Sequence, residues 1–113
     1  MSEYDVVLNT RPNSWSIKSI YSMEYTCGMT DVNEIKKFLT KYGSDSDASK
    51  VYVNDNKCVG IMATNMMTGD IELTRLTTAR SNWIVVYRYK DGGYDIFVLS
   101  DQMWHKLFRR SRS

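Results

Sequence analysis

The chain has 113 residues, of which 42% are hydrophobic and 25% charged, and its formal net charge is +2. This length allows one hydrophobic core but not two, so we expect a single domain over residues 1–113. One proline, six glycines and 12% aromatic residues exclude collagenous and low-complexity classes. There is no apolar run of the roughly 18 residues that a membrane helix needs, and residues 1–5 lack the layout of a signal peptide. We therefore expect a soluble, cytoplasmic protein with no membrane partner.

The first half of the chain predicts two extended segments and one helix. Residues 4–8 form a short segment with β-branched residues before a turn at Pro12, which favours a strand. Residues 15–25 favour a second extended segment. The clearest helix covers residues 31–42, because Asp31 can cap it and apolar residues recur at helical spacing. Residues 44–49 are serine- and aspartate-rich and predict a loop.

The second half predicts strands joined by short turns. Residues 50–53 and 58–63 form one predicted hairpin, a turn at residues 65–69 leads to a strand over 70–76, and residues 82–89 pair with 93–99 around Asp91-Gly92. Large apolar residues occupy both faces of segment 82–89, which predicts a central strand covered on two sides. Ser100 can cap a last helix.

These elements together predict an α+β fold. We expect a mainly antiparallel sheet of about five to seven strands that ends in a C-terminal meander. One central helix over about 31–42 and one C-terminal helix over about 101–110 complete the prediction. We find no internal repeat, and no segment matches the motif set of a known family.

Chemistry-bearing residues are sparse. Cys27 and Cys58 have no Cys-x-x-Cys or Cys/His spacing, so we interpret them as free thiols. The one histidine, His105, has no cysteine near it in sequence, and no glycine pattern of a phosphate-binding loop occurs. We therefore predict no catalytic residue, no cofactor and no enzyme activity.

Asp70 and Glu72 are the weakly supported candidates for a metal site. One residue apart on a strand, they would point to the same face and could hold a hard cation. Their layout resembles in part that of restriction-endonuclease-type nucleases, which place an acid and then an acid and a lysine one residue apart on neighbouring strands. Thr74 stands where that pattern has the lysine, so the resemblance is in layout only.

The basic C-terminus carries more functional content. Residues 106–113 form a basic tail on a mildly acidic body, and aromatic residues lie directly before and within it. Basic side chains neutralise phosphates and exposed aromatic rings stack on bases, so the tail predicts contact with nucleic acid or with a partner. The candidate residues, including three arginines that could extend the same surface, are Trp104, His105, Lys106, Arg109, Arg110, Arg112, Arg88, Arg80 and Arg75.

A short chain without a catalytic constellation acts mainly through its surface. We expect a small accessory or regulatory protein, of the kind that phages encode, that binds and modulates a host or other cellular protein or a protein–nucleic-acid complex. Its anchors would be exposed members of a set of interface-type residues, namely Trp15, Trp83, Trp104, Met62, Met66 and Met67. Direct nucleic-acid binding by the tail is one alternative, and a metal-dependent nuclease built on Asp70 and Glu72 is another. The sequence does not specify whether the protein forms homo-oligomers.

Overall fold

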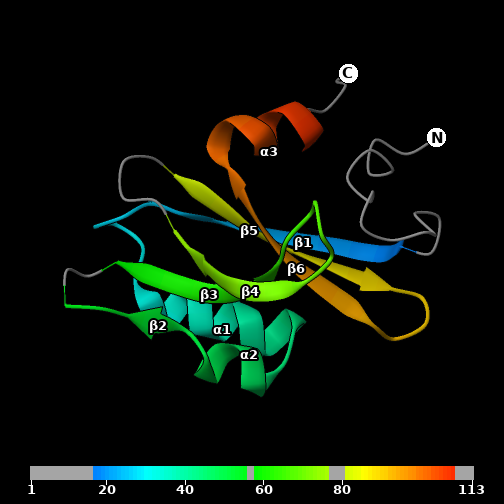
Figure 1. The fold of residues 1–113 in the computed structure, drawn as a ribbon, viewed down its shortest axis with the longest axis horizontal. Coiled ribbons are helices and arrows are strands. Elements are labelled where there is room, and N and C mark those ends of the chain that lie inside the picture. The colour runs from blue at the N-terminus through cyan, green and yellow to red at the C-terminus, as the bar shows by residue number, and fades with distance from the viewer. Residues whose placement is uncertain (1–16, 56–57, 77–80, 109–113) are drawn as a thin grey trace.

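The computed structural model describes residues 17–55, 58–76 and 81–108, and these form six strands and three helices (Figure 1). The α+β class predicted from the sequence is confirmed. The strand predicted at residues 4–8 lies outside the described residues. The elements in chain order are β1 (Ile17–Tyr25), α1 (Val32–Tyr42), α2 (Asp45–Ser49), β2 (Tyr52–Val53), β3 (Val59–Thr64), β4 (Ile71–Arg75), β5 (Asn82–Tyr89), β6 (Tyr94–Ser100) and α3 (Asp101–Phe108).

The strands form two antiparallel three-stranded sheets, with strand orders β1-β5-β6 and β2-β3-β4. The prediction of a single sheet that ends in a C-terminal meander is therefore wrong. The chain breaks the meander between β4 and β5, because β1 and not β4 is the neighbour of β5 (Figure 1). A central strand needs a partner on each edge, and β1 supplies the second edge from the other end of the chain. The hairpins β2–β3 and β5–β6 are confirmed.

Strand β5 is covered on both faces, as its sequence predicted. One face contributes to a core that it shares with α1 and β3, which we name the α1 core; it includes Ile35, Leu39, Ile61, Ile84, Val86 and Ile96. The opposite face contributes to a core closed by α3, the α3 core, which includes Val85, Tyr87, Tyr89, Phe97, Leu99 and Phe108. The β1-β5-β6 sheet thus separates two hydrophobic clusters.

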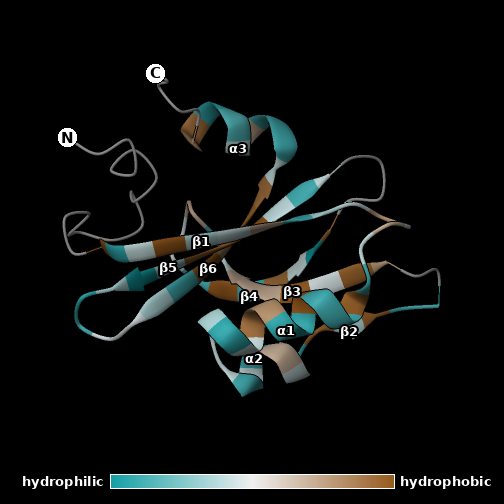
Figure 2. Cartoon of the chain, turned by 180° about the vertical axis from the view of Figure 1, so that it is seen from behind, coloured by the Kyte–Doolittle hydropathy of each residue, from teal (hydrophilic) through white to brown (hydrophobic). Residues whose placement is uncertain are grey.

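Helix α1 matches its prediction. The Asp31 carboxylate accepts a hydrogen bond of 3.0 Å from the Asn33 N–H, and the Gly43 N–H donates to the Leu39 carbonyl oxygen at 2.7 Å. Seen from behind, α1 and α2 lie together beside β3, and apolar and polar positions alternate along α1 (Figure 2). The apolar positions Ile35 and Leu39 are buried in the α1 core.

The loop predicted at residues 44–49 is wrong, because it contains α2. The Ser44 hydroxyl oxygen accepts a hydrogen bond from the Asp47 N–H, which caps this short helix, and Ala48 is buried. Serine and aspartate favour both turns and helix caps, so their presence did not separate the two outcomes.

Helix α3 begins at Asp101, as predicted, and is described to Phe108. The Ser100 hydroxyl oxygen accepts a hydrogen bond from the Met103 N–H at 3.1 Å. The rings of Trp83 and Trp104 stack with their centroids 3.8 Å apart, which holds the helix against β5. Within the described residues, no helix is long and apolar enough to cross a membrane.

Candidate functional site

One face of the β2-β3-β4 sheet points away from the α1 core. Directly paired residues of antiparallel strands project to the same side, so the pairs Tyr52–Gly60, Gly60–Arg75 and Met62–Leu73 share this side with Ile71. We name this surface the outer face; its residues are Tyr52, Gly60, Met62, Ile71, Leu73 and Arg75. The alternate residues of β3, Val59, Ile61 and Ala63, point the other way and are buried.

The outer face exposes large apolar side chains. Ile71 is 68% exposed, Leu73 56% and Tyr52 53%, and Met62 beside them is half-buried. Single exposed apolar residues are common on proteins, but four that project from three adjacent strands form a continuous patch. Such a patch is typical of a surface that another molecule covers.

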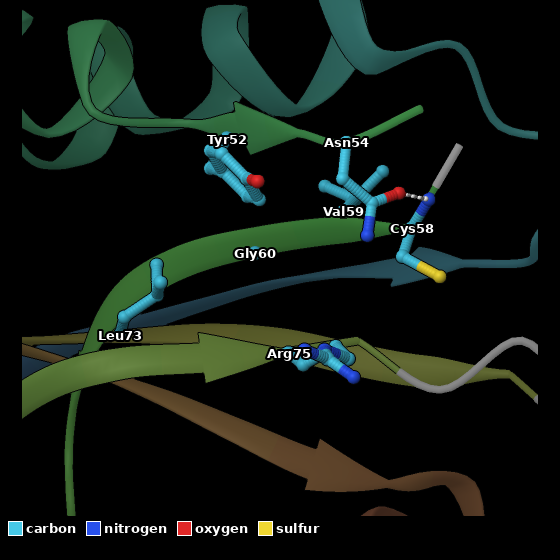
Figure 3. Close-up of a pocket in the computed structure, with 7 residues that line it drawn as sticks. All are labelled: Tyr52, Asn54, Cys58, Val59, Gly60, Leu73 and Arg75. Carbon is cyan, nitrogen blue, oxygen red and sulfur yellow. Dashed lines mark hydrogen bonds between the residues drawn. The ribbon is translucent and has the colours of Figure 1, made fainter. Parts of the chain in front are cut away.

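A hollow of about 370 Å³ lies within this surface (Figure 3). Gly60 forms its floor between Tyr52 and Leu73, and a Cβ atom at Gly60 would stand only 3.2 Å from Leu73 Cδ1. The absence of a side chain at Gly60 therefore leaves the space open. The full lining is Tyr52, Asn54, Cys58, Val59, Gly60, Leu73 and Arg75.

The hollow is lined by polar and apolar groups in similar proportion. Asn54 Oδ1 accepts a hydrogen bond of 2.9 Å from the Cys58 N–H, which fixes the entrance to β3 (Figure 3). Arg75 supplies a positive charge at the rim, and no carboxylate lines the hollow among the described residues. This arrangement can accept an apolar or aromatic side chain and can pair a carboxylate with Arg75.

The free edge of β4 continues the same surface. Among the described residues, β4 pairs with β3 alone. The Asn65 N–H donates to the Asp70 carbonyl oxygen, and the Leu76 N–H donates to the Val59 carbonyl oxygen. These two bonds show which residue pairs of β3 and β4 are hydrogen-bonded, because such pairs alternate with pairs that are not. By that alternation, Ile71, Leu73 and Arg75 direct their backbone N–H and C=O groups away from β3. Within the described part of the chain, the three residues with outer-face side chains thus also offer backbone groups that no other strand pairs with.

The predicted basic residues that the structure describes do not form one cluster. Arg75 lies exposed on the outer face, whereas Arg88 lies on β5 and faces α1, across the sheet from α3. His105 and Lys106 are exposed on α3, and His105 Nε2 lies 3.2 Å from Asp101 Oδ1. Arg80, Arg109, Arg110 and Arg112 lie outside the described residues.

The two predicted tryptophan anchors that the structure describes, Trp83 and Trp104, make most of their contacts inside the protein. Trp104 is half-buried, and its ring packs between Trp83 and Phe108. The Trp83 Nε1–H donates a 2.8 Å hydrogen bond to Asp101 Oδ1. Trp104 Nε1 is buried and has no hydrogen-bond partner among residues 17–55, 58–76 and 81–108. Trp15 lies outside the described residues. Residues 109–113 of the basic tail lie outside them as well, so binding by the tail stays a prediction.

The methionines at the β3–β4 turn differ from one another. Met66 packs against the α3 core, whereas Met67 is 92% exposed. Met62 belongs to the outer face. Only part of this predicted group is therefore available to a partner.

Asp70 and Glu72 have no third metal ligand beside them among the described residues. Asp70 precedes β4 in the turn, and Glu72 Oε2 accepts a 3.1 Å hydrogen bond from Asn65 Nδ2. Within the described residues, no group of three metal-ligating side chains occurs. The pair alone gives no geometry for the nuclease alternative, which stays a prediction.

Cys27 and Cys58 are free and half-buried thiols, as the sequence interpretation expected. Both lie near Tyr25, which is 3% exposed. Burial raises the pKa of the Tyr25 hydroxyl above its ordinary value, and the neighbouring Cys27 and Cys58 raise it further. Tyr25 and Cys27 belong to the α1 core, whereas Cys58 also lines the hollow on the outer face.

Sequence reasoning missed Tyr52, Ile71 and Leu73. The alternation over residues 71–75 was visible, but two sheets were needed to show which side of β4 faces solvent. No protein-family model matches the chain, and neither the curated proteins nor the solved structures give a significant match.

Proposed function

We propose that this chain is a small, non-catalytic accessory or regulatory protein, of the kind that phages encode, that binds a host protein through the outer face of its β2-β3-β4 sheet. The observation that carries the proposal is the exposed patch of Tyr52, Ile71 and Leu73 around the open floor at Gly60. Leaving these side chains in water is unfavourable by about 25 cal/mol per Å², which a partner would recover on binding.

The residue types of the patch suit a protein partner. Tyrosine and arginine are enriched among residues that dominate interface energies, and both Tyr52 and Arg75 border the hollow. An apolar side chain of the partner would occupy the hollow above Gly60, and a partner carboxylate would pair with Arg75. The surface therefore offers one central apolar contact with a charged group at its rim.

The β4 edge suggests how the partner is held. An extended segment of the host protein would align beside β4 and bond to the outward N–H and C=O groups of Ile71, Leu73 and Arg75. Its alternate side chains would then lie over the outer face. This mode combines backbone hydrogen bonds, which provide affinity, with an apolar contact, which provides selectivity.

A tagged pull-down from host extract, with and without added nuclease, tests the proposal. The wild-type chain should retain a stoichiometric protein partner that survives nuclease. The double variant Ile71→Asp, Leu73→Asp should lose that partner at least tenfold, because two charges would be buried at the contact. Both positions are exposed, so the variant should keep the wild-type circular dichroism spectrum and melting temperature.

The matched control is Met29→Asp, since Met29 is 84% exposed, lies between β1 and α1 and does not line the hollow. This variant should retain the partner fully. Equal capture by the double variant and the wild type would refute the proposed surface. Loss of every partner after nuclease treatment would instead favour the nucleic-acid alternative.

A further inference from the structure

A second hollow, of about 330 Å³, lies where the start of β1, the end of α1 and the end of β5 meet. Four of its lining side chains are basic: Lys18, Lys41, Arg88 and Lys90. Among the described residues, no carboxylate lines it. It shares no residue with the hollow on the outer face. We name this surface the basic hollow.

Lys18 reaches the basic hollow from a β-bulge. Ile17 pairs with Tyr89 and Ser19 pairs with Arg88, so Lys18 is an extra residue that has no partner in β5. A bulge of this kind redirects a side chain relative to regular strand alternation. The irregularity in β1 thus occurs at the residue that adds a positive charge to the hollow.

Arg88 is held in place by α1. Its Nη1 donates a 3.1 Å hydrogen bond to the Tyr42 carbonyl oxygen, and its guanidinium carbon lies 5.2 Å from the centroid of the Tyr94 ring. The bond uses one of the five N–H donors of the guanidinium group. A fixed, planar guanidinium with remaining donors is suited to binding phosphate oxygens.

In the part of the chain that the structure describes, the three lysines have no counter-charge. Within the described residues, Lys18, Lys41 and Lys90 form no ion pair, and Lys41 Nζ lies 5.3 Å from the Tyr42 ring centroid. Two neighbouring carboxylates bind neutral donors: Asp91 accepts from the Gly93 N–H, and Asp47 accepts from Ser44 and Tyr94. The four basic side chains that line the hollow outnumber these two carboxylates, so its net charge is positive, which attracts anions.

Aromatic rings lie beside these charges. Tyr21 and Tyr42 also line the hollow, and their rings stack with centroids 4.0 Å apart. Proteins that bind single-stranded nucleic acids combine a positively charged groove with aromatic side chains. Four cations also exceed the charge of one phosphate group, which favours a ligand with several phosphates in a row.

We infer that the basic hollow binds the phosphate backbone of a single-stranded nucleic acid. Arg88 and the three lysines contact successive phosphates, and the tyrosine pair provides the adjoining aromatic wall. This inference goes beyond the proposed protein-binding function and does not depend on it, because the residues of the two surfaces differ. Binding by this site does not require the basic tail.

Fluorescence anisotropy with labelled single-stranded RNA and DNA oligonucleotides tests the inference, with salt raised from about 50 to about 200 mM. The variant Lys18→Gln, Lys41→Gln, Lys90→Gln should bind more weakly. Its plot of log affinity against log salt should be shallower by about 2, since each lost phosphate contact contributes about 0.7. Arg88 is left intact so that its bond to α1 remains.

The matched control is Lys36→Gln, Lys37→Gln, Lys50→Gln, which removes three exposed lysines that do not line the hollow. This control should keep a slope close to that of the wild type. If the triple variant of the hollow lysines has a lower melting temperature than the wild type, Lys90→Gln alone should still make the salt slope shallower by about 0.7.

Two results would overturn the inference. The first is that the wild-type protein fails to bind the oligonucleotides even at low salt. The second is that the hollow variant and the control have equal salt slopes, which would assign binding to the tail or to general charge. Vesicles containing phosphatidylserine serve as a second probe. Binding to vesicles without binding to oligonucleotides would assign the hollow to a membrane surface and refute the nucleic-acid ligand.

Discussion

The two sheets of this protein differ in how they are covered. The β1-β5-β6 sheet has a hydrophobic core on each side, and all residues of β5 except Trp83 and Arg88 are buried. The β2-β3-β4 sheet buries one face against the α1 core, and its strands β2 and β4 remain largely exposed. Since both sheets are antiparallel and of equal strand number, the difference lies in what packs on them.

We expect the two sheets to have different roles, with the first providing stability and the second recognition. Residues buried on both faces of a sheet cannot change without creating a cavity, whereas residues on a solvated face can change freely unless another molecule binds there. We therefore expect the first sheet to carry most of the folding free energy. Under the proposed function, the apolar residues of the second sheet's outer face serve binding and not folding.

The largest expected effect tests this division directly. Phe97→Ala, in the α3 core, should lower the free energy of unfolding by about 3–5 kcal/mol, because it removes a fully buried ring. Leu73→Ala, on the outer face, should lower it by only about 0.5 kcal/mol. Urea denaturation followed by tryptophan fluorescence measures both. Similar losses for the two variants would contradict the division.

An intermediate effect concerns the junction between the sheets. Thr64 Oγ1 at the end of β3 donates a 3.1 Å hydrogen bond to Asp95 Oδ1 on β6, and the Tyr89 hydroxyl donates to Asp95 Oδ2 at 2.7 Å. Thr64→Val removes the bond between the sheets and should cost about 1–2 kcal/mol in denaturant unfolding.

Thr68→Val is the control for Thr64→Val, because it removes a hydroxyl from the exposed β3–β4 turn. Its expected cost is smaller. Equal costs would mean that the junction adds nothing specific to the association of the two sheets.

The smallest effect arises from pH. Burial raises the pKa of Tyr25, and burial together with the hydrogen bond to Asp47 raises that of Tyr94, both above the ordinary value of 10.0. Above pH 10 the unfolded chain loses these protons before the folded chain does, so stability is complete below that pH and declines as pH rises further. Thermal melts between about pH 8 and 11 should show this decline.

The variant Tyr94→Phe should flatten the decline, since it removes one of the two groups. Tyr52→Phe, on the exposed outer face, serves as the control and should leave the shape of the decline unchanged. A steeper decline in Tyr94→Phe than in the wild type would contradict the sign of the effect.

Local patterns in the sequence predicted individual elements well. The spacing of Ile35 and Leu39, with Asp31 and Gly43 at the ends, identified α1, and Asp91-Gly92 identified the β5–β6 hairpin. Each of these signals depends on residues a few positions apart, whose geometry the backbone fixes.

The arrangement of the sheets and the candidate site depended on distant residues. No local sequence pattern in either segment indicates that β1 pairs with β5. The sequence therefore offered no reason to prefer this pairing over the predicted meander. Ile71 and Leu73 likewise fit a buried face as well as an exposed one. Only the position of β3 against the α1 core shows that their side chains point outward.

The pairing of β1 with β5 also has a kinetic consequence. Paired residues of the two strands lie 57 positions apart at Tyr25–Asn82 and 72 positions apart at Ile17–Tyr89. At a synthesis rate of about 5–20 residues per second, β1 leaves the ribosome roughly 3–14 seconds before its partner exists. The β1–β5 pair therefore forms only after the residues between the two strands have been synthesised. Such non-local closure is slow, on the order of milliseconds to seconds.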